Sequence, residues 1–403
     1  MYKRLKIIYM YKILLLLSCI FAVSCGNKRN KITNNILSAP DMTECQDTCM
    51  VVDIDKVLSI SSDSLLNIVK AIKYVPLDMS NEPVGAITDI AISDKYICLL
   101  DGQISKSIFI YKKNGQFVNH ICAKGHGHGE YILPSSIEYD DSTNLLCVKD
   151  DGQSKFLYYD INGKFVKEDK TVSSIYCVHF GESVVNMLAE GQAYDSEINY
   201  HLIVSNGDSI AFKGIPYSNI QLDYFVSNKF RNNYAGNLLF HPVASDTVYQ
   251  INHDYSYCPR FIIKNEKSLW NYKNQRLSLE KKTQLIKDKK LKRVSAFHEG
   301  RNYLFYSIYA LDSKEQVIKN TPYIYNKDKR QAYRVEGLPP GEIKGFVPLD
   351  LLCVYKDWCV SLFNPYNLKM QLGHKYYINE PRLKNIVENS QVTSNPVLVF
   401  FKI

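Results

Sequence analysis

Two histidines that lie two positions apart raise the first chemical question in this sequence. Residues 124–131 read KGHGHGEY, so His126 and His128 stand among three glycines and are followed by Glu130. Imidazole and carboxylate groups bind zinc, but a zinc site also needs ligands from elsewhere in the chain. No further cluster of His, Asp or Glu lies nearby in the sequence. The sequence therefore predicts no metal site and no cofactor.

Short motifs that mark known catalytic chemistry are also absent. The sequence holds no G-x-x-x-x-G-K-[ST], no H-E-x-x-H, no G-x-S-x-G and no C-x-x-C pair, which would indicate phosphate, zinc, serine-nucleophile or redox chemistry. Gly125, Gly127 and Gly129 are spaced differently from the glycines of a dinucleotide-binding loop. We interpret them as a sharp turn, because glycine permits positive φ and the close approach of another backbone.

The first 24 residues have the pattern of a targeting segment. Basic residues precede the apolar run 13–23, ILLLLSCIFAV, which is too short to span a bilayer comfortably. The run ends in AVSCG, which resembles a bacterial lipoprotein signal with Cys25 as the acylated residue. Ala22 departs from that pattern, and an ordinary secretory signal is the alternative. We expect residues 1–24 to be a signal peptide and acyl chains on Cys25 to anchor the protein to a membrane.

Residues 25–50 follow this cysteine with a polar composition. Basic residues precede the first acidic residue in the stretch, and the composition is typical of a flexible tether. Acidic residues directly after the cysteine would favour surface display. Their absence favours an outer-membrane lipoprotein that faces the periplasm.

The charge of the chain does not indicate a nucleic-acid partner. The formal net charge is +8, and removal of residues 1–24, which carry four Lys or Arg and no acid, would leave +4. Nucleic-acid binding usually requires a denser basic patch. The densest basic run, residues 280–294, is interleaved with acids. We interpret it as a solvated helix or loop, with polyanion or membrane-surface binding as the alternative.

Two pairs of cysteines allow predictions about disulfides. Cys45 and Cys49 could form a local disulfide in an oxidising compartment. Cys353 precedes the segment VYKDWCV, residues 354–360, which contains Cys359. A two-residue turn at Lys356 and Asp357 would place Cys353 opposite Val360 and Cys359 opposite Val354. The two cysteines would then face opposite sides of a hairpin and could not bond.

A repeat indicates the fold. Residues 108–118, IFIYKKNGQFV, align without gaps with residues 156–166, FLYYDINGKFV, and five of the eleven positions are identical. Each copy reads as two strands joined at Asn-Gly, which favours a tight hairpin with a type I′ turn. With the strands that precede it, each unit predicts a four-stranded antiparallel sheet, which is one blade of a β-propeller.

Further strand patterns predict six blades, with seven as the alternative. The expected inner strands begin in the segments 85–93, 135–140, 174–180, 237–243, 293–310 and 345–363. The terminal NPVLVFFKI, residues 395–403, is expected to pair with AIKYVPLD, residues 71–78, and so to close the ring and remove free sheet edges. We expect one all-β domain over residues 51–403.

Several segments together resemble a known family. IKYVPLD, IFIYKKNGQFV, KGHGHGEY and NPVLVFFKI are similar to segments of six-bladed β-propeller lipoproteins of Gram-negative anaerobes, which are NHL- or TolB-like. The resemblance covers residues 50–403 and is strongest over 70–170. It implies a propeller fold and a cell-envelope location but no defined activity. It also implies that the three glycines shape a crossover loop, while the histidines fill variable positions.

The sequence favours a non-enzymatic binding protein. A lipid-anchored propeller presents loops on two faces and a central channel, to which a glycan, a peptide or an envelope protein could bind, although the fold alone is a weak argument. A hydrolase or lyase with groups at the channel mouth, and a structural subunit of an envelope complex, are the alternatives. The candidate ligand-binding residues near strand ends are Glu130, Tyr131, His179, Arg231, His241 and His298.

Overall fold

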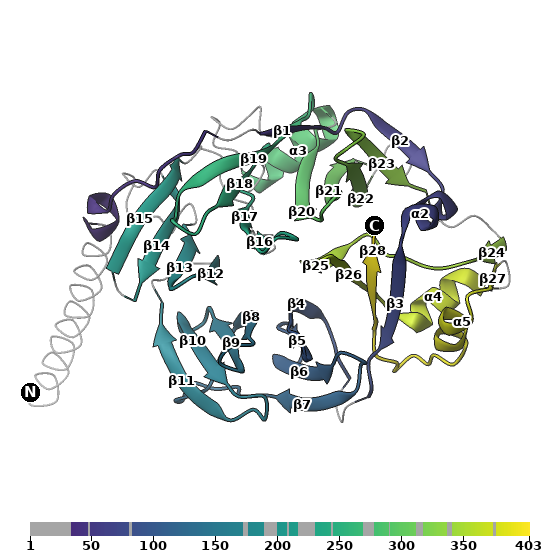
Figure 1. Cartoon of the computed structure of the whole chain (residues 1–403), viewed down its shortest axis with the longest axis horizontal. Helices are drawn as coiled ribbons and strands as arrows, with labels where there is room; N and C mark the ends of the chain where they lie inside the picture. The colour runs from purple at the N-terminus through teal and green to yellow at the C-terminus, as the bar shows by residue number, and fades with distance from the viewer. Residues whose placement is uncertain are drawn as a thin grey trace, which may run out of the picture.

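The computed structural model describes residues 34–403 with internal gaps. The gaps cover residues 47–48, 80–82, 172–175, 189–199, 208, 217–229, 243–244, 269–277, 290, 312–316, 337–340 and 374–375. The predicted signal peptide and Cys25 lie outside the described residues. Six sheets of four or five strands surround a central axis (Figure 1), so the predicted six-bladed β-propeller is confirmed.

Blades 1 to 3 are four-stranded sheets whose strands follow one another along the chain, with the first strand innermost. Blade 1 contains β4 (Ile87–Ile92), β5 (Tyr96–Asp101), β6 (Ser107–Lys112) and β7 (Phe117–Ile121). Blade 2 contains β8 (Pro134–Asp140), β9 (Leu145–Asp150), β10 (Lys155–Tyr159) and β11 (Phe165–Lys170). Blade 3 contains β12 (Tyr176–Phe180), β13 (Ser183–Met187), β14 (Tyr200–Asn206) and β15 (Ser209–Pro216).

Blades 4 to 6 also use strands from the amino-terminal part of the chain. Blade 4 contains β16 (Phe230–Asn232), β17 (Leu238–Phe240), β18 (Thr247–Ile251), β19 (Tyr257–Lys264) and β1 (Met50–Asp53). Blade 5 contains β20 (Arg293–Glu299), β21 (Tyr303–Leu311), β22 (Ile318–Asn326), β23 (Gln331–Val335) and β2 (Val57–Ile60). Blade 6 contains β25 (Leu351–Tyr355), β26 (Trp358–Phe363), β28 (Val397–Lys402) and β3 (Ala71–Pro76).

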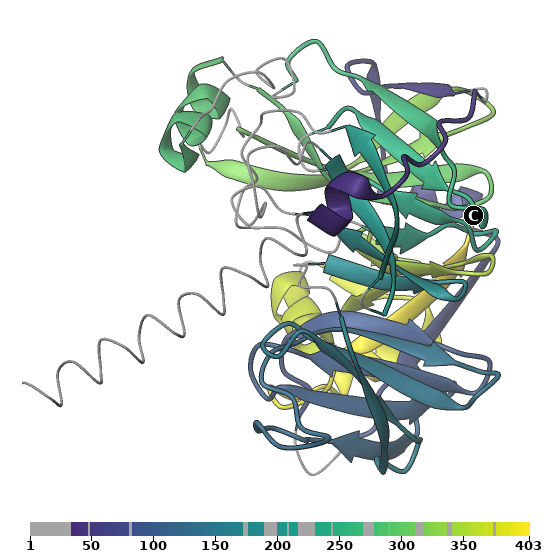
Figure 2. The same ribbon diagram turned by 90° about the vertical axis from the view of Figure 1, so that its left-hand side faces the viewer.

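Short elements outside the blades lie mostly on one side of the ring. They are α2 (Ser62–Ile68), α3 (Leu279–Lys289), α4 (Pro365–Leu372), α5 (Pro381–Glu388) and the parallel pair β24 (Gly341–Ile343) and β27 (Tyr376–Ile378). Figure 2 shows α3 in green and α4 with α5 in yellow-green on one face, while the carboxyl terminus lies toward the other. Asn364 caps α4 by accepting a hydrogen bond from Asn367 N at 2.9 Å, and Pro365 begins the helix, an arrangement that favours helix initiation.

The carboxyl-terminal strand closes the ring as predicted. β28 pairs antiparallel with both β26 and β3, with Val397 opposite Pro76 and Lys402 opposite Ala71. β3 therefore provides the outer strand of a blade whose other three strands come from the opposite end of the chain. Cys353 opposes Val360 and Val354 opposes Cys359 in the neighbouring hairpin, and this register prediction is also confirmed.

The Asn-Gly hairpins form, but the predicted type I′ turn is wrong. Gly115 has φ +91°, whereas Asn114 is not among the residues with positive φ. Gly115 N donates a hydrogen bond to Lys112 O at 2.9 Å, and Gly163 N donates one to Asp160 O at 3.0 Å in the second copy. Each loop is thus a three-residue connection with glycine in the left-handed position, and the strand register shifts beside it.

The fourth inner strand differs from its predicted position. We expected it in residues 237–243, but this segment contains β17, the second strand of blade 4. The inner strand is β16, a three-residue strand with the sequence FRN. Its polar sequence reads as a turn, whereas the apolar LLF of β17 reads as a buried strand.

The amino-terminal segment differs from the expected tether. Residues 34–38 form a helical turn in which Ile36 is fully buried. Met42 N donates a hydrogen bond to Lys213 O at 2.7 Å on blade 3. The chain then continues as β1 and β2, which add parallel outer strands to blades 4 and 5. The described part of residues 25–50 is therefore packed along the outside of the propeller.

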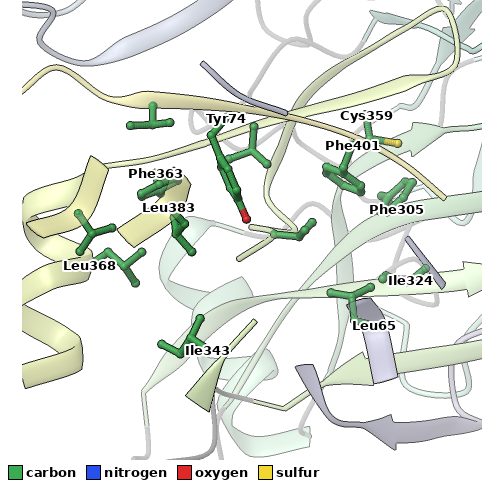
Figure 3. Packing of buried hydrophobic residues seen from close by; sticks show 14 of the residues in the cluster. Leu65, Tyr74, Phe305, Ile324, Ile343, Cys359, Phe363, Leu368, Leu383 and Phe401 are labelled. Carbon is green, nitrogen blue, oxygen red and sulfur yellow. The ribbon is translucent and has the colours of Figure 1, made fainter. Parts of the chain in front are cut away.

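The packing between blades 5 and 6 fixes both chain ends. Figure 3 shows Tyr74 of β3 beside Phe363, and Phe305 beside Phe401 of β28. The rings meet edge to face at centroid distances of 6.3 and 5.9 Å, a favourable geometry for aromatic pairs. Tyr74 also accepts a hydrogen bond from Phe346 N at 2.8 Å. These contacts join β3 and β28 to the neighbouring parts of blades 5 and 6.

Candidate functional site

The inner strands enclose a cavity of about 300 Å³ at the centre of the propeller. It is lined by residues of β4, β8, β12, β16 and β25, which belong to five different blades. The polar groups that matter most for its chemistry are Asp89, Glu138, His179, Arg231, Cys353 and Tyr355. A concave site with converging polar groups is the usual form of a ligand-binding site.

His179 and Glu138 form a polar pair between blades 2 and 3. Nδ1 of His179 lies 3.1 Å from Glu138 Oε2, and the backbone N–H of His179 donates to Glu138 Oε1 at 3.2 Å. Nε2 of His179 lies 3.1 Å from the hydroxyl of Tyr158. The imidazole also packs on Phe156 at a centroid distance of 4.1 Å. Contacts from several strands therefore fix the orientation of this imidazole at the cavity wall.

Asp89 and Arg231 bring opposite charges to the same cavity. Burial raises the pKa of Asp89 to about 6, although a hydrogen bond from Ile137 N at 3.0 Å and the charge of Arg231 act in the opposite direction. Burial lowers the pKa of Arg231, and the negative charge of Asp89 opposes this effect. Arg231 Nη1 donates a hydrogen bond to Phe230 O at 2.8 Å. The cavity can thus accept and donate charge-assisted hydrogen bonds.

Cys353 does not provide an activated nucleophile in this cavity. Burial raises the pKa of its thiol to about 12, the charge of Asp89 raises it further, and Arg231 opposes this. A thiol is reactive mainly as the thiolate. At neutral pH the Cys353 side chain is therefore a neutral, weakly polar part of the wall.

The structure brings two of the predicted site residues together. His179 and Arg231 both line the cavity. His298 lies on the inner strand β20 but is buried behind the wall, where burial and the charge of Arg231 lower its pKa to about 3. His241 follows β17, and its Nε2 donates to Ser245 O at 3.0 Å. Neither histidine lines the cavity.

Glu130 and Tyr131 belong to the loop before β8 and do not reach the channel cavity. Glu130 Oε2 accepts a hydrogen bond from Gly127 N at 2.8 Å, so its carboxylate stabilises its own loop. Tyr131 is fully buried, and its hydroxyl lies 3.0 and 3.1 Å from the carbonyl oxygens of Lys106 and Ile121. Both side chains have structural contacts in the structure.

The glycine-rich loop that contains these residues has the sharp turn expected of it. Gly129 has φ +75°, and a Cβ there would lie 2.7 Å from the ring of Phe165. Gly125 has φ +156° and lies against the carboxylate of Glu130, whereas Gly127 does not have positive φ. His126 is exposed, and His128 Nδ1 lies 3.3 Å from Glu168 Oε1. The imidazoles therefore lie at the surface of the loop, where His128 also packs on Phe165 at a centroid distance of 4.8 Å.

In the part of the chain that the structure describes, no group of three or more His, Cys, Asp or Glu is placed to hold a metal ion. Within the same ranges, no helix combines the length and the apolar sequence that a bilayer span needs. Cys45, Cys49, Cys353 and Cys359 are all free thiols.

Sequence reasoning missed Asp89 and Glu138. Asp89 interrupts the apolar strand ITDIAI, and Glu138 stands within SSIEYD. An acidic residue inside an otherwise apolar inner strand is a usable signal, because a channel wall is the place in a propeller where such a strand meets a polar space. The hydrophobic pattern alone predicts that both segments are inner strands, but it does not use the charges that they carry.

Comparison with known proteins places the chain in a family. A family profile described as a domain of unknown function, DUF4934, matches residues 49–402. The search of curated proteins gives no match. A protein of Bacteroides fragilis NCTC 9343 named as an exported protein is 18% identical, with a TM-score of 0.66 over 88% of this chain and 99% of that chain. A member of the DUF4221 family from Bacteroides vulgatus is 12% identical, with a TM-score of 0.49 over 83% and 97% of the two chains. Because the family profile covers most of its length, the chain belongs to the DUF4934 family.

Proposed function

We propose that this protein is a lipid-anchored propeller of the cell envelope that binds a small polar ligand in its central channel without transforming it. The observation that carries the proposal is the cavity of about 300 Å³, in which Asp89, Glu138, His179 and Arg231 converge from four blades. Groups of both charges in one half-open cavity suit a ligand with hydrogen-bond donors and acceptors, such as a glycan unit or a peptide terminus.

The envelope location rests on the sequence. The basic, apolar and cysteine-containing order of residues 1–25 supports export and acylation. The Bacteroides fragilis protein that shares the fold is also named as an exported protein. We expect the acyl chains to hold the protein at the outer membrane, with the propeller in the periplasm.

The alternative is an enzyme, a hydrolase or lyase, that uses the same cavity. Asp89 has a pKa raised to about 6, which is a suitable range for a group that transfers protons near neutral pH. His179 beside Glu138 could serve as its partner. The binding proposal is favoured for two reasons. The thiol of Cys353 is not activated as a nucleophile. Both ring nitrogens of His179 already lie within hydrogen-bond distance of protein groups, Nδ1 beside Glu138 and Nε2 beside Tyr158.

A screen of glycan and peptide arrays tests the binding proposal. The purified full-length chain should bind a small set of related ligands on the arrays. Arg231→Gln changes the cavity wall and should abolish this binding. Arg334→Gln changes an exposed arginine on β23 and should leave the binding unchanged. Mass spectrometry of the retained ligand after long incubation decides between the two functions. An intact ligand supports binding, and a cleaved or rearranged ligand would establish the enzyme instead.

A further inference from the structure

Two lysines of blade 6 are held over the indole ring of Trp358. The Nζ atom of Lys73 lies 4.6 Å from the ring centroid, and that of Lys402 lies 4.8 Å from it. Within the described residues, neither ammonium group has a hydrogen-bond or ion-pair partner. Their donors are therefore available to a ligand, while the ring limits the positions that these long side chains adopt.

Two further lysines lie over Tyr355. Lys113 Nζ is 4.4 Å and Lys356 Nζ is 5.3 Å from the ring centroid. Lys356 also donates a hydrogen bond to Asp94 Oδ1 at 2.6 Å, and Lys113 donates one to Ser93 O at 2.8 Å. We call the following residues the lysine–aromatic surface: Lys73, Lys113, Lys356, Lys402, Tyr355 and Trp358.

The strand register explains why these side chains gather. Tyr355 directly opposes Trp358 across the hairpin of β25 and β26, so both rings lie on the same face of the sheet. Phe400 of β28 opposes Lys73 of β3 and packs edge to face on Trp358 at a centroid distance of 6.5 Å. Apart from Lys113, which follows β6 of blade 1, the surface is therefore built on the four paired strands of blade 6 and the turn between β25 and β26.

A pocket of about 160 Å³ adjoins this surface between blades 5 and 6. Lys70, Arg301 and Lys402 line it, and Lys402 belongs to the lysine–aromatic surface as well. Arg301 is held by Asp357, with its Nη2 3.0 Å from Oδ1. The buried side chains of Phe305 and Cys359 contribute an apolar floor. The pocket is thus cationic at its edge and apolar inside.

The surface also reaches the channel. Tyr355 lines the channel cavity, and Trp358 and Lys402 continue from it toward the pocket between blades 5 and 6. Val354 and Cys359, which line the pocket, alternate along the strands with Tyr355 and Trp358, so the pocket lies on the opposite face of the sheet. A linear ligand would contact both by crossing the end of β28 at Lys402, which belongs to both. An apolar pocket beside several separate lysine and arginine side chains suits a polymer of sugar rings, each of which carries one negative charge.

We propose that the lysine–aromatic surface and the adjoining pocket bind an acidic polysaccharide, with one sugar unit in the pocket and its carboxylate or sulfate groups on the lysines. Single-stranded nucleic acid is disfavoured because it needs open aromatic faces for base stacking, and lysines cover the rings of Trp358 and Tyr355. A membrane surface is disfavoured because it needs protruding apolar groups, whereas the most exposed apolar side chains, such as Ile104 and Val392, lie elsewhere.

Binding of defined polymers to the purified full-length chain tests this proposal. Polygalacturonate and dextran sulfate represent the carboxylated and sulfated forms, and neutral dextran is the uncharged control. Lys73→Gln/Lys402→Gln should weaken binding of at least one acidic polymer roughly fivefold or more. It should also reduce the slope of log affinity against log salt by about two, because two counterions fewer are released. The matched control Lys281→Gln/Lys287→Gln removes two exposed lysines of α3 and should have no effect.

Gly300→Ala tests whether binding requires the pocket itself or only the positive charge of the surface. A Cβ at Gly300 would lie 3.3 Å from Tyr303 O, 3.6 Å from Phe305 Cε2 and 3.9 Å from Cys359 Sγ, so it would narrow the pocket without changing its charge, at the cost of a small shift of the Tyr303 carbonyl. We expect weaker binding of the acidic polymer by a variant that still folds, with at most a small decrease in melting temperature. Equal affinity for dextran, single-stranded DNA or phosphatidylglycerol vesicles, or an equal loss in the α3 control, would overturn the proposal. None of these outcomes depends on whether the channel holds a ligand.

Discussion

Among single residues, Asp89 is a channel group whose pKa the fold brings close to neutral pH. Its pKa is raised to about 6 by burial in a wall that also contains Arg231. The unfolded chain would titrate near the ordinary value of about 3.9. Folding therefore takes up a proton between these two values, and the stability of the protein depends on pH in this range.

Asp89→Asn should remove this dependence. The wild-type protein should lose stability as the pH rises from about 4 to about 6, since the folded state then binds more protons than the unfolded state. The variant keeps an oxygen for the hydrogen bond from Ile137 N and should become more stable relative to the wild type across this window. Melting temperatures of both proteins at several pH values measure the effect. A difference that is constant with pH would contradict the raised pKa.

Gly129 should matter for folding more than the histidines beside it. Gly129→Val introduces a branched side chain at φ +75° and against Phe165, so we expect a loss of about 1–3 kcal/mol. The matched variant His126→Ser/His128→Ser should change the free energy of unfolding little, because both histidines are exposed. Denaturant unfolding of the two variants checks this. A larger loss in the histidine variant would show that the imidazoles hold the loop together.

Part of the site could be predicted from the sequence at this scale. His179 and Arg231 were found because they stand at the ends of strand-like segments. Asp89 was missed because the apolar residues around it predict a strand, and its own charge was not used to predict a site. The glycine-rich sequence before Glu130 and Tyr131 does not show whether their side chains point to the channel or into the protein. In the structure Glu130 accepts a hydrogen bond from Gly127 N, and the hydroxyl of Tyr131 donates one to Lys106 O.

Among the elements, β28 has the greatest effect on the architecture. It lies between β26 and β3, and its apolar side chains are buried on both faces of the sheet. Without it, β3 would lose its only pairing partner among the described strands, and blade 6 would be left with two strands. The ends of the chain are thus joined through hydrogen bonds and apolar packing.

Deletion of Val397–Ile403 should prevent folding of the soluble protein. Each buried apolar side chain contributes roughly 1.5–3 kcal/mol, and β28 buries five residues, so the sum is comparable with the stability of a domain, about 5–15 kcal/mol. We expect the truncated chain in inclusion bodies or degraded, whereas removal of Ile403 alone should be tolerated. Purification of the truncated chain as a monomer with an unchanged melting temperature would contradict the closure by β28.

The elements could be predicted where the hydrophobic pattern is strong. The two hairpins with Asn-Gly and the strand β28 have apolar runs bounded by turn residues. β16 has only three residues and a polar sequence, so its pattern resembles a turn. The packing of residues 34–60 along blades 3 to 5 depends on open outer strand edges and on pockets for side chains such as Ile36. The hydrophobic pattern of the sequence does not show which strand edges are open or where such pockets lie.

At the scale of the whole molecule, the amino-terminal segment connects the predicted anchor with the ring. It contacts blade 3 at Met42, adds strands to blades 4 and 5, and completes blade 6 with β3. A pull on the anchor would therefore be distributed over four blades. From its helical turn at residues 34–38 onward, the described part of the chain is therefore packed against the propeller.

Cys25→Ala should release the protein from membranes. Acylation requires the cysteine, and two or more acyl chains are needed for a stable anchor. We expect the variant in the soluble periplasmic fraction with an unchanged fold, and the wild type in the membrane fraction after a salt wash. Cys45→Ala controls for the loss of a thiol as such. If the Cys25 variant still fractionates with membranes after the salt wash, the prediction of a lipid anchor at Cys25 is wrong.

The central claim is that the channel cavity is a binding site, and calorimetric titration of the ligand selected on the arrays tests it most directly. The wild type and Arg334→Gln should bind the ligand with the same affinity. Arg231→Gln removes the cation of the cavity and should weaken binding by roughly tenfold or more, since charge-assisted hydrogen bonds are worth about 1.5–3 kcal/mol. An unchanged affinity in Arg231→Gln, with the fold intact, would show that the ligand binds outside the channel and would contradict the account.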